Sequence, residues 1–395
     1  MRTVEEHRAT IAALLPLMPV ETIPLARARG LVLAQDVASV TALPPFHNSA
    51  MDGYAVRAAD VAAVPTTLSV ADDIPAGRTS VSPLEPGTAQ RIMTGALLPP
   101  GADAIVPVEH TNARTDRVTI DTAPTAGAHI RSIGEDIAAG QVALAAGRVL
   151  YPAQLGLAAA IGHAGLPVYR RPRVVVLSTG SELIEPGQSL QPGQIYESNS
   201  VQLCAAIEDA GGSARAVHFV PDDVEEFLAT VESETADADL LVTSGGVSAG
   251  AYEVVKDAFS DLGTVSFAKV AMQPGGPQGW GRVGDVPVVT LPGNPVSAFV
   301  SFEVFLRPAL RTAMRLPAVD RPRIEARLVA DVTSPAGKRQ FLRGFFADGN
   351  VSQVGGPGSH LLAHLARANC LVVIPEDTEQ MAVGDTVEVW LLEGI

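Results

Sequence analysis

Short apolar, β-branched runs alternate with amphipathic segments through the middle of the chain, from about residue 172 to residue 316. Such runs indicate buried strands, and apolar residues at helical spacing indicate helices. The expected strands are 174–177, 214–220, 240–243, 265–270 and 286–290, the expected helices are 199–210, 222–235, 252–259 and 296–314, and 273–281 is a Gly- and Pro-rich stretch. Strands that alternate with helices predict a doubly wound, mostly parallel α/β sheet.

The regions that flank this segment follow other patterns. Residues 4–18 and 153–162 have helical spacing, whereas 56–130 and the chain after 323 contain short strand-like pieces separated by Pro and Gly. We therefore expect an α/β multidomain protein. Its expected domains are a discontinuous helical linker domain (1–44 and 131–171), an inserted β domain (45–130), the doubly wound domain (172–316) and a small C-terminal β-barrel-like domain (323–395). The helix at 4–18 would pack on the helix at 153–162.

Composition narrows the class of ligand. A formal net charge of −15 argues against broad binding of nucleic acid. No apolar run reaches the ~18 residues of a membrane span, and the N-terminus lacks an apolar signal segment. The two cysteines, Cys204 and Cys370, are far apart and fit a reducing compartment. We therefore expect a cytoplasmic protein that binds a small molecule.

Three glycine-containing turns follow three of the expected strands, at 177–182, 244–246 and 291–295. A strand, a glycine turn and a helix in succession point backbone N–H groups at one spot, which suits an anion. The carboxyl ends of neighbouring parallel strands line one crevice of an open sheet. The sequence therefore predicts an anion site in this crevice, and the alternative for any single turn is a tight connection without a ligand.

Carboxylates in glycine-braced loops are the second group of candidates: Asp52, Asp136 and Glu182. The chain has no P-loop, no dinucleotide fingerprint and no Cys/His set for zinc. Each carboxylate alone also fits a turn or cap residue. Together with an anion-binding turn they suggest Mg²⁺ that is held by oxygen ligands and bridges phosphates. The candidate basic contacts, for which solvated side chains are the alternative, are Lys269, Arg343 and Arg131.

Seven motifs, in consistent order from about residue 1 to residue 390, resemble the molybdopterin molybdenumtransferase family, to which the C-terminal enzymatic domain of gephyrin is related. The motifs are PFHNSAMDGYA (45–55), IMTGA (92–96), GADA (101–104), GEDI (134–137), STGSEL (178–183), SGGVS (244–248) and LPGNPVS (291–297). Seven ordered motifs make the resemblance specific over nearly the whole chain.

The resemblance implies an elongated homodimer of four-domain chains, whose active cleft lies between the doubly wound domain of one subunit and the inserted β domain of the other. It implies a magnesium-dependent enzyme that inserts molybdate into adenylylated molybdopterin and releases AMP, with molybdopterin adenylyltransferase as its pathway neighbour. The residues implied as catalytic are Asp52, Thr94, Asp136 and Glu182, of which Asp136 and Glu182 would bind Mg²⁺. The residues implied as binding the pterin or the nucleotide are Ser244, Gly245, Gly246, Ser248, Asp222 (which also fits a helix cap), Glu253, Lys269, Pro292, Gly293, Asn294 and Arg343.

Several positions depart from the family pattern. Gln273 and Gly276 stand where members usually carry two lysines, His364 lies where they usually show a serine pair, and Glu253 replaces an aspartate. The lysines and one serine belong to the set that contacts molybdate in the family. These departures keep a second hypothesis open, a gephyrin-like dimeric scaffold that binds a protein segment. The retained carboxylates favour the enzyme, because a scaffold has no chemical need for them.

Overall fold

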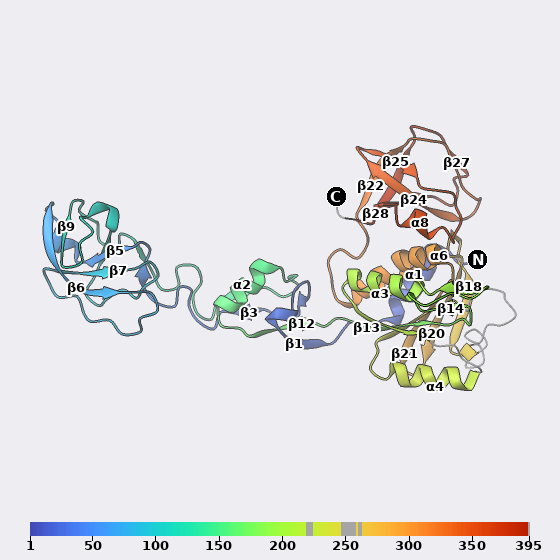
Figure 1. The fold of residues 1–395 in the computed structure, drawn as a ribbon, viewed down its shortest axis with the longest axis horizontal. Coiled ribbons are helices and arrows are strands. Elements are labelled where there is room, and N and C mark those ends of the chain that lie inside the picture. Colours follow the sequence, from blue (N-terminus) through green and yellow to red (C-terminus); the bar gives the residue numbers. More distant parts are fainter. Residues whose placement is uncertain (219–223, 246–257, 260–262, 394–395) are drawn as a thin grey trace. The chain divides into compact units, whose positions relative to one another are not determined.

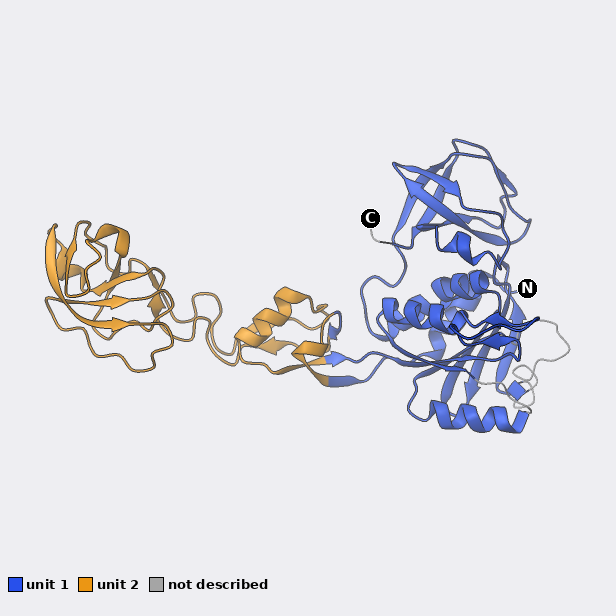
Figure 2. Ribbon diagram, in the orientation of Figure 1, with its two compact units in different colours: residues 1–21, 30–32, 168–395 blue, residues 22–29, 33–167 orange. Residues whose placement is uncertain are grey.

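The computed structural model describes residues 1–218, 224–245, 258–259 and 263–393. The chain forms two compact units, shown in different colours in Figure 2. Unit 1 contains residues 1–21, 30–32 and 168–395, and unit 2 contains residues 22–29 and 33–167. The division into four domains that the sequence predicts stays a prediction.

A six-stranded sheet forms the centre of unit 1 (Figure 1). Its strands, in spatial order, are β16 (Ser213–His218), β13 (Arg173–Ser178), β17 (Leu240–Ser244), β21 (Val286–Leu291), β20 (Pro277–Val283) and β18 (Val265–Lys269). The first four are parallel, whereas β20 is antiparallel to both of its neighbours. The mostly parallel α/β sheet that the sequence predicts is therefore confirmed.

Helices cover both faces of this sheet. The helix α4 (Val224–Thr235) lies on one face, and α3 (Asn199–Ala210) and α6 (Pro295–Ser301) lie on the other (Figure 1). Gly211 ends α3 with a φ of 104°, a left-handed conformation that glycine adopts without strain. The helix expected at 252–259 lies outside the described residues except for its last two positions.

Two segments differ from their expected form. The helix expected at 296–314 is present as three consecutive pieces, and a π-helical turn, η4 (Phe302–Leu306), separates α6 from α7 (Arg307–Ala313). Pro308 lacks an N–H group and its ring clashes with an ordinary helical carbonyl, which accounts for the local widening. The Gly- and Pro-rich stretch at 273–281 contains the last residue of β19 (Met272–Gln273) and most of β20. A Cβ atom at Gly281 would lie 2.2 Å from the carbonyl oxygen of Thr264, so this glycine permits close strand packing rather than a loop.

The helix expected at 4–18 packs within unit 1. The helix α1 (Val4–Leu14) buries Val4 and Ile11 in the core of unit 1, against η4 and α7. The second helix, α2 (Pro152–Ala160), belongs to unit 2. An apolar stripe shows that a helix packs on something, but it does not name the partner.

The C-terminal part of unit 1 is a closed barrel of five strands, since β24 pairs with β26 as well as with β25. The barrel strands are β22 (Arg323–Leu328), β24 (Arg339–Ala347), β25 (Asn350–Gln353), β26 (Cys370–Ile374) and β28 (Thr386–Leu391). The shorter elements of unit 1 are β14 (Leu183–Ile184), β15 (Ile195–Tyr196), β23 (Val332–Thr333), α8 (Leu362–Leu365) and β27 (Gln380–Met381). The β19 strand adds to β24, which ties the barrel to the α/β sheet region.

Unit 2 contains a five-stranded sheet with the order β8-β5-β7-β6-β9. These strands are β5 (Gly53–Val56), β6 (Thr66–Ile74), β7 (Thr88–Ile92), β8 (Ala104–Pro107) and β9 (Arg117–Ile120). The remaining elements before β13 are β1 (Val20–Pro24), η1 (Leu25–Arg27), β2 (Val32–Leu33), β3 (Val37–Ala38), β4 (Asn48–Ser49), η2 (Ala58–Val61), η3 (Val108–His110), β10 (Ile130–Arg131), β11 (Val142–Leu144) and β12 (Gly165–Tyr169). Among the described residues, no helix has the length and apolar character needed to span a bilayer.

His7 lies in α1 and is fully buried between two aromatic rings. Its ring centroid is 5.1 Å from that of Trp280 and 4.6 Å from that of Phe305. Neither ring nitrogen has a hydrogen-bond partner among the described residues. Burial first, and then the charge of Arg2, lower the pKa of His7 to about 4. Protonation of this ring therefore opposes folding.

We expect the protein to lose stability as the pH falls from 6.5 towards 4. The unfolded chain takes up a proton on His7 near pH 6.5, whereas the folded chain does so near pH 4, so the unfolded state binds more protons in this window. The free energy of unfolding should fall by about 2 kcal/mol between pH 7 and pH 5 through this group alone. Denaturant unfolding of the wild type and of His7→Phe at both pH values measures this contribution. An equal loss of stability in the two proteins would contradict the assignment.

Candidate functional site

Three strands of the central sheet end side by side at the crevice that the sequence predicts. Ser178, Ser244 and Leu291 are register partners at the carboxyl ends of β13, β17 and β21. Gly245 turns the chain with a φ of 98°, and its backbone N–H donates to the Leu291 carbonyl oxygen at 3.0 Å. A Cβ atom on Gly293 would lie 3.5 Å from the Gly245 Cα atom, so these two turns are adjacent. The structure therefore brings the predicted turn residues together.

Two residues that sequence reasoning missed hold these turns in place. The Asn199 side-chain Nδ2 donates to the Ser244 Oγ at 3.1 Å and to the Gly293 carbonyl oxygen at 2.7 Å. Glu197 is buried, and its carboxylate accepts from the Ser178 Oγ at 3.0 Å and from the Ser200 backbone N–H at 2.8 Å. An acidic residue just before the polar start of an expected helix was the signal available in the sequence.

A cavity of about 280 Å³ opens beside these turns. It is lined by Gln273, Pro274, Gly275, Pro277, Pro292, Gly293, Asn294, Ser297, Pro357 and Ser359. The backbone N–H of Val296, in the first turn of α6, donates to the Ser359 carbonyl oxygen at 3.1 Å. The barrel therefore contributes one wall of the cavity and the turn before α6 contributes the other.

In unit 2, Asp52 and Thr94 form a direct contact. The Asp52 carboxylate accepts from the Thr94 backbone N–H at 2.6 Å and from the Thr94 Oγ1 at 2.8 Å. These two bonds, the backbone one first, hold the pKa of Asp52 below its ordinary value. The side chain of Asp52 is exposed. The pair thus presents a charged carboxylate of fixed orientation to solvent.

The loop that carries Asp136 lies against the same part of unit 2. The backbone N–H groups of Asp136 and Ile137 donate to the Leu43 carbonyl oxygen at 3.0 and 3.2 Å. The neighbouring Ile133 N–H donates to the His47 Nδ1 at 3.2 Å. These bonds join the segments around residues 43–49 and 132–137 and leave the Asp136 side chain exposed.

Glu182 lies in unit 1, in the turn after β13. A Cβ atom built on Gly180 would lie 2.7 Å from the Glu182 Oε2. The Glu182 carboxylate is therefore close to the Gly180 backbone. The side chain of Glu182 is exposed. The described residues contain no group of three potential metal-binding His, Cys, Asp or Glu side chains. Exposed carboxylates fit Mg²⁺, which takes one or two carboxylates and completes its shell with water and substrate phosphates.

Some predicted site residues are not part of this geometry. Asp222, Gly246, Ser248 and Glu253 lie outside the described residues. Lys269 ends the edge strand β18 with an exposed side chain, and it is not among the residues that line the 280 Å³ cavity.

Comparisons with known proteins match the whole chain. Residues 2–162 match the model "MoeA N-terminal region (domain I and II)", 175–312 match "Probable molybdopterin binding domain" and 325–392 match "MoeA C-terminal region (domain IV)". The chain is 55% identical over 99% of both chains to molybdopterin molybdenumtransferase 2 of Mycobacterium tuberculosis. It is 35% identical to molybdopterin molybdenumtransferase of Haemophilus influenzae, over 98% of both chains. The chain belongs to the molybdopterin molybdenumtransferase family.

A solved structure of a relative has the same fold. The molybdopterin biosynthesis moeA protein from Pyrococcus horikoshii aligns with a TM-score of 0.80 and 32% identity, over 100% of this chain and 99% of that chain. The resemblance that the sequence motifs indicated is therefore confirmed.

Three of the described positions at which the resemblance implies a departure are Gln273, Gly276 and His364, and of these Gln273 lines the 280 Å³ cavity. The Gln273 Oε1 accepts from the Nε2 of the buried Gln340 at 3.0 Å. A Cβ atom on Gly276 would meet only carbonyl oxygens, at 3.5 and 3.6 Å, so a side chain fits there. The His364 ring packs on Gly355, where a Cβ atom would lie 2.6 Å from it.

Arg343 holds the loop that follows β25. Its buried guanidinium donates to three backbone carbonyl oxygens, those of Val354 at 3.4 Å, Gly358 at 3.0 Å and Gly356. Burial lowers the pKa of Arg343 below its ordinary value. These three bonds stabilise the loop between β25 and α8. A guanidinium has five N–H donors, so the role of Arg343 as an anion contact stays a prediction.

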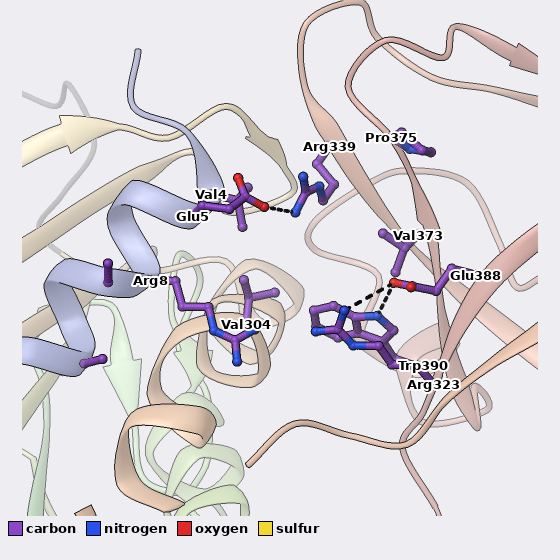
Figure 3. Close-up of a pocket in the computed structure, with 12 residues that line it drawn as sticks. Val4, Glu5, Arg8, Val304, Arg323, Arg339, Val373, Pro375, Glu388 and Trp390 are labelled. Atoms are coloured by element: carbon purple, nitrogen blue, oxygen red, sulfur yellow. Dashed lines mark hydrogen bonds and ion pairs between the residues drawn. The ribbon is translucent and has the colours of Figure 1, made fainter. Parts of the chain in front are cut away.

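Figure 3 shows a second cavity, of about 690 Å³, between α1 and the C-terminal barrel. Several of its polar groups contact one another. Arg339 donates to Glu5 at 2.5 Å, and the Trp390 Nε1 donates to Glu388 at 2.7 Å while Arg323 lies over the Trp390 ring. None of the residues that line it is one of the matched family positions.

Proposed function

We propose that this protein transfers molybdenum from molybdate to adenylylated molybdopterin and releases AMP. The observation that carries the proposal is 55% identity to a molybdopterin molybdenumtransferase over the whole chain. The adjacent turns at Ser244, Gly245 and Gly293 support it, because they lie at the carboxyl ends of parallel strands, where open α/β sheets bind ligands. The scaffold hypothesis gains no support, since the relatives reported above carry enzyme or biosynthesis names.

The proposed reaction has two parts. Water adds across the phosphoanhydride, one P–O bond breaks, and AMP and the pterin phosphate result. Two molybdenum–sulfur bonds form with the pterin dithiol as one molybdenum–oxygen bond breaks, and that oxygen leaves as water with the two thiol protons. Molybdenum stays at the same oxidation level throughout, so no external oxidant or reductant is required.

The turns of unit 1 would bind the nucleotide and phosphate part of the substrate. Backbone N–H groups at glycine turns and the start of the helix that begins with α6 favour negative charge. The 280 Å³ cavity beside Asn294 and Ser297 would take molybdate, since it adjoins the same turn. Both substrates would then meet at the carboxyl edge of the sheet.

Asp136 and Glu182 would supply carboxylate oxygens to Mg²⁺, which fits their exposed side chains. When bound, Mg²⁺ would neutralise charge that develops on the phosphate oxygens. Asp52 would remain ionised and oriented by Thr94, ready to accept a hydrogen bond from attacking water.

We further propose that the protein is a homodimer in the cytoplasm and receives its pterin substrate from a molybdopterin adenylyltransferase. Two subunits would complete the active cleft, as the family resemblance implies. Light scattering at micromolar concentration should give twice the chain mass of 41.0 kDa. A monomer at this concentration would contradict the shared-cleft proposal.

AMP release by the purified protein tests the proposed activity. The protein should release AMP from adenylylated molybdopterin when molybdate and Mg²⁺ are present. A protein that is folded, by circular dichroism, and that releases no AMP would overturn the proposal.

A further inference from the structure

Asn199 joins two of the three turns that meet at the crevice. One Nδ2 group donates both to the Ser244 Oγ at 3.1 Å and to the Gly293 carbonyl oxygen at 2.7 Å. Ser244 ends β17 and Gly293 lies two residues after β21. A single side chain therefore links the two turns, beyond the pairing of their strands.

The orientation of this amide follows from its partners. A backbone carbonyl oxygen can only accept a hydrogen bond, so the atom that faces Gly293 must be the donor Nδ2. The Asn199 Oδ1 is buried and has no hydrogen-bond partner among the described residues. A flipped amide would place that oxygen against the Gly293 carbonyl, which is repulsive.

The start of α3 is itself held rigidly. The buried Glu197 carboxylate accepts from Ser200 at the helix start and from Ser178 at the end of β13. A carboxylate at this place also favours the N-terminal end of the helix dipole. Glu197 thus ties Asn199 to the third strand of the crevice.

We propose that Asn199 is a positioning residue that presets the Ser244 and Gly293 turns for the anionic part of the pterin nucleotide. The inference rests on the proposed function and adds a residue to it. The turns bind the same phosphate groups before and during the reaction. Loss of Asn199 should therefore weaken substrate binding more than it slows the chemical step.

Asn199→Ala tests the positioning role by steady-state kinetics. The KM for adenylylated molybdopterin should rise roughly tenfold, the expected scale for two lost hydrogen bonds. The kcat should change by less than about threefold, because uniform binding affects KM alone. If the wild type is active and Asn199→Ala has the same KM as the wild type, the proposal is overturned.

Asn199→Asp supplies a pH readout that a purely structural role would not produce. At pH 8 the carboxylate opposes both the Gly293 carbonyl and the substrate phosphates, so kcat/KM should fall about 100-fold, the scale for repulsion between close charges at a half-buried site. A protonated carboxyl can donate to Gly293 again. The ratio of variant to wild-type kcat/KM should then rise at least about tenfold as the pH falls to 5.5, since a nearby carbonyl and burial raise the carboxyl pKa.

The matched control is Asn369→Asp in the C-terminal barrel. Asn369 also donates its Nδ2 to a backbone carbonyl oxygen, that of Phe346 at 2.9 Å, far along the chain from the crevice turns. The control should leave KM and its pH dependence unchanged. If the ratio of the Asn199→Asp kcat/KM to the wild-type kcat/KM does not vary with pH, the inference fails while the proposed function stands. If the wild type itself releases no AMP, the proposed function fails.

Discussion

Replacement of Glu182 by glutamine, or of Asp136 by asparagine, is expected to lower AMP release by about two to three orders of magnitude, the scale for loss of a group that stabilises transition-state charge. Each change keeps the shape of the side chain and removes the charge that a bound Mg²⁺ needs. Both carboxylates are exposed. The folded state should therefore tolerate both variants, and initial rates of AMP release at saturating substrate measure the effect.

Two control variants make the same chemical change at another exposed carboxylate, one for each test variant. Glu185→Gln changes an exposed residue three positions after Glu182, and Asp121→Asn changes an exposed residue of unit 2. Both controls should keep wild-type activity and thermal stability. Turnover that is unchanged in Glu182→Gln and in Asp136→Asn would remove these residues from the proposed site.

The second large effect is expected at positions 273 and 276. Molybdate is a dianion, and a charged hydrogen bond is worth about 1.5–3 kcal/mol net. Lysines at positions 273 and 276 should therefore tighten molybdate binding by roughly 10²–10⁴-fold. Arg343 already donates to three backbone carbonyl oxygens, which leaves fewer of its five N–H donors for molybdate. The open space at Gly276 makes the change sterically possible.

Calorimetric titration with sodium molybdate measures this effect on the wild type and on the variant Gln273→Lys/Gly276→Lys. Gln380→Lys adds one positive charge at an exposed position of β27 and should leave the affinity unchanged. If the wild type already binds tightly and the two lysines add nothing, another group supplies the charge.

The regular elements of unit 1 could be predicted because their residues obey simple periods. The run 240–243 is apolar and β-branched and forms β17, while Gly211 marks the end of α3 as its conformation requires. The partner of α1 and the π-helical turn η4 could not be predicted. Both depend on contacts between residues that are distant in sequence, which local patterns do not contain.

The candidate site shows the same limit. The glycine turns could be predicted from the sequence because glycine is the usual residue where a tight turn needs a positive φ. The role of Asn199 was hidden, since an asparagine at a helix start reads as an ordinary cap. The sequence indicated Arg343 as an anion contact, which stays a prediction, and its bonds to three backbone carbonyl oxygens of the loop before α8 are visible only in the structure.

The most direct test of the proposed function compares two products in a single reaction. Purified protein is mixed with adenylylated molybdopterin and Mg²⁺, with and without molybdate, and AMP and pterin-bound molybdenum are both quantified. The account predicts that the two products appear together, in equal amounts, only when molybdate is present. Pterin-bound molybdenum that fails to appear while AMP accumulates, or the absence of both products, would contradict it.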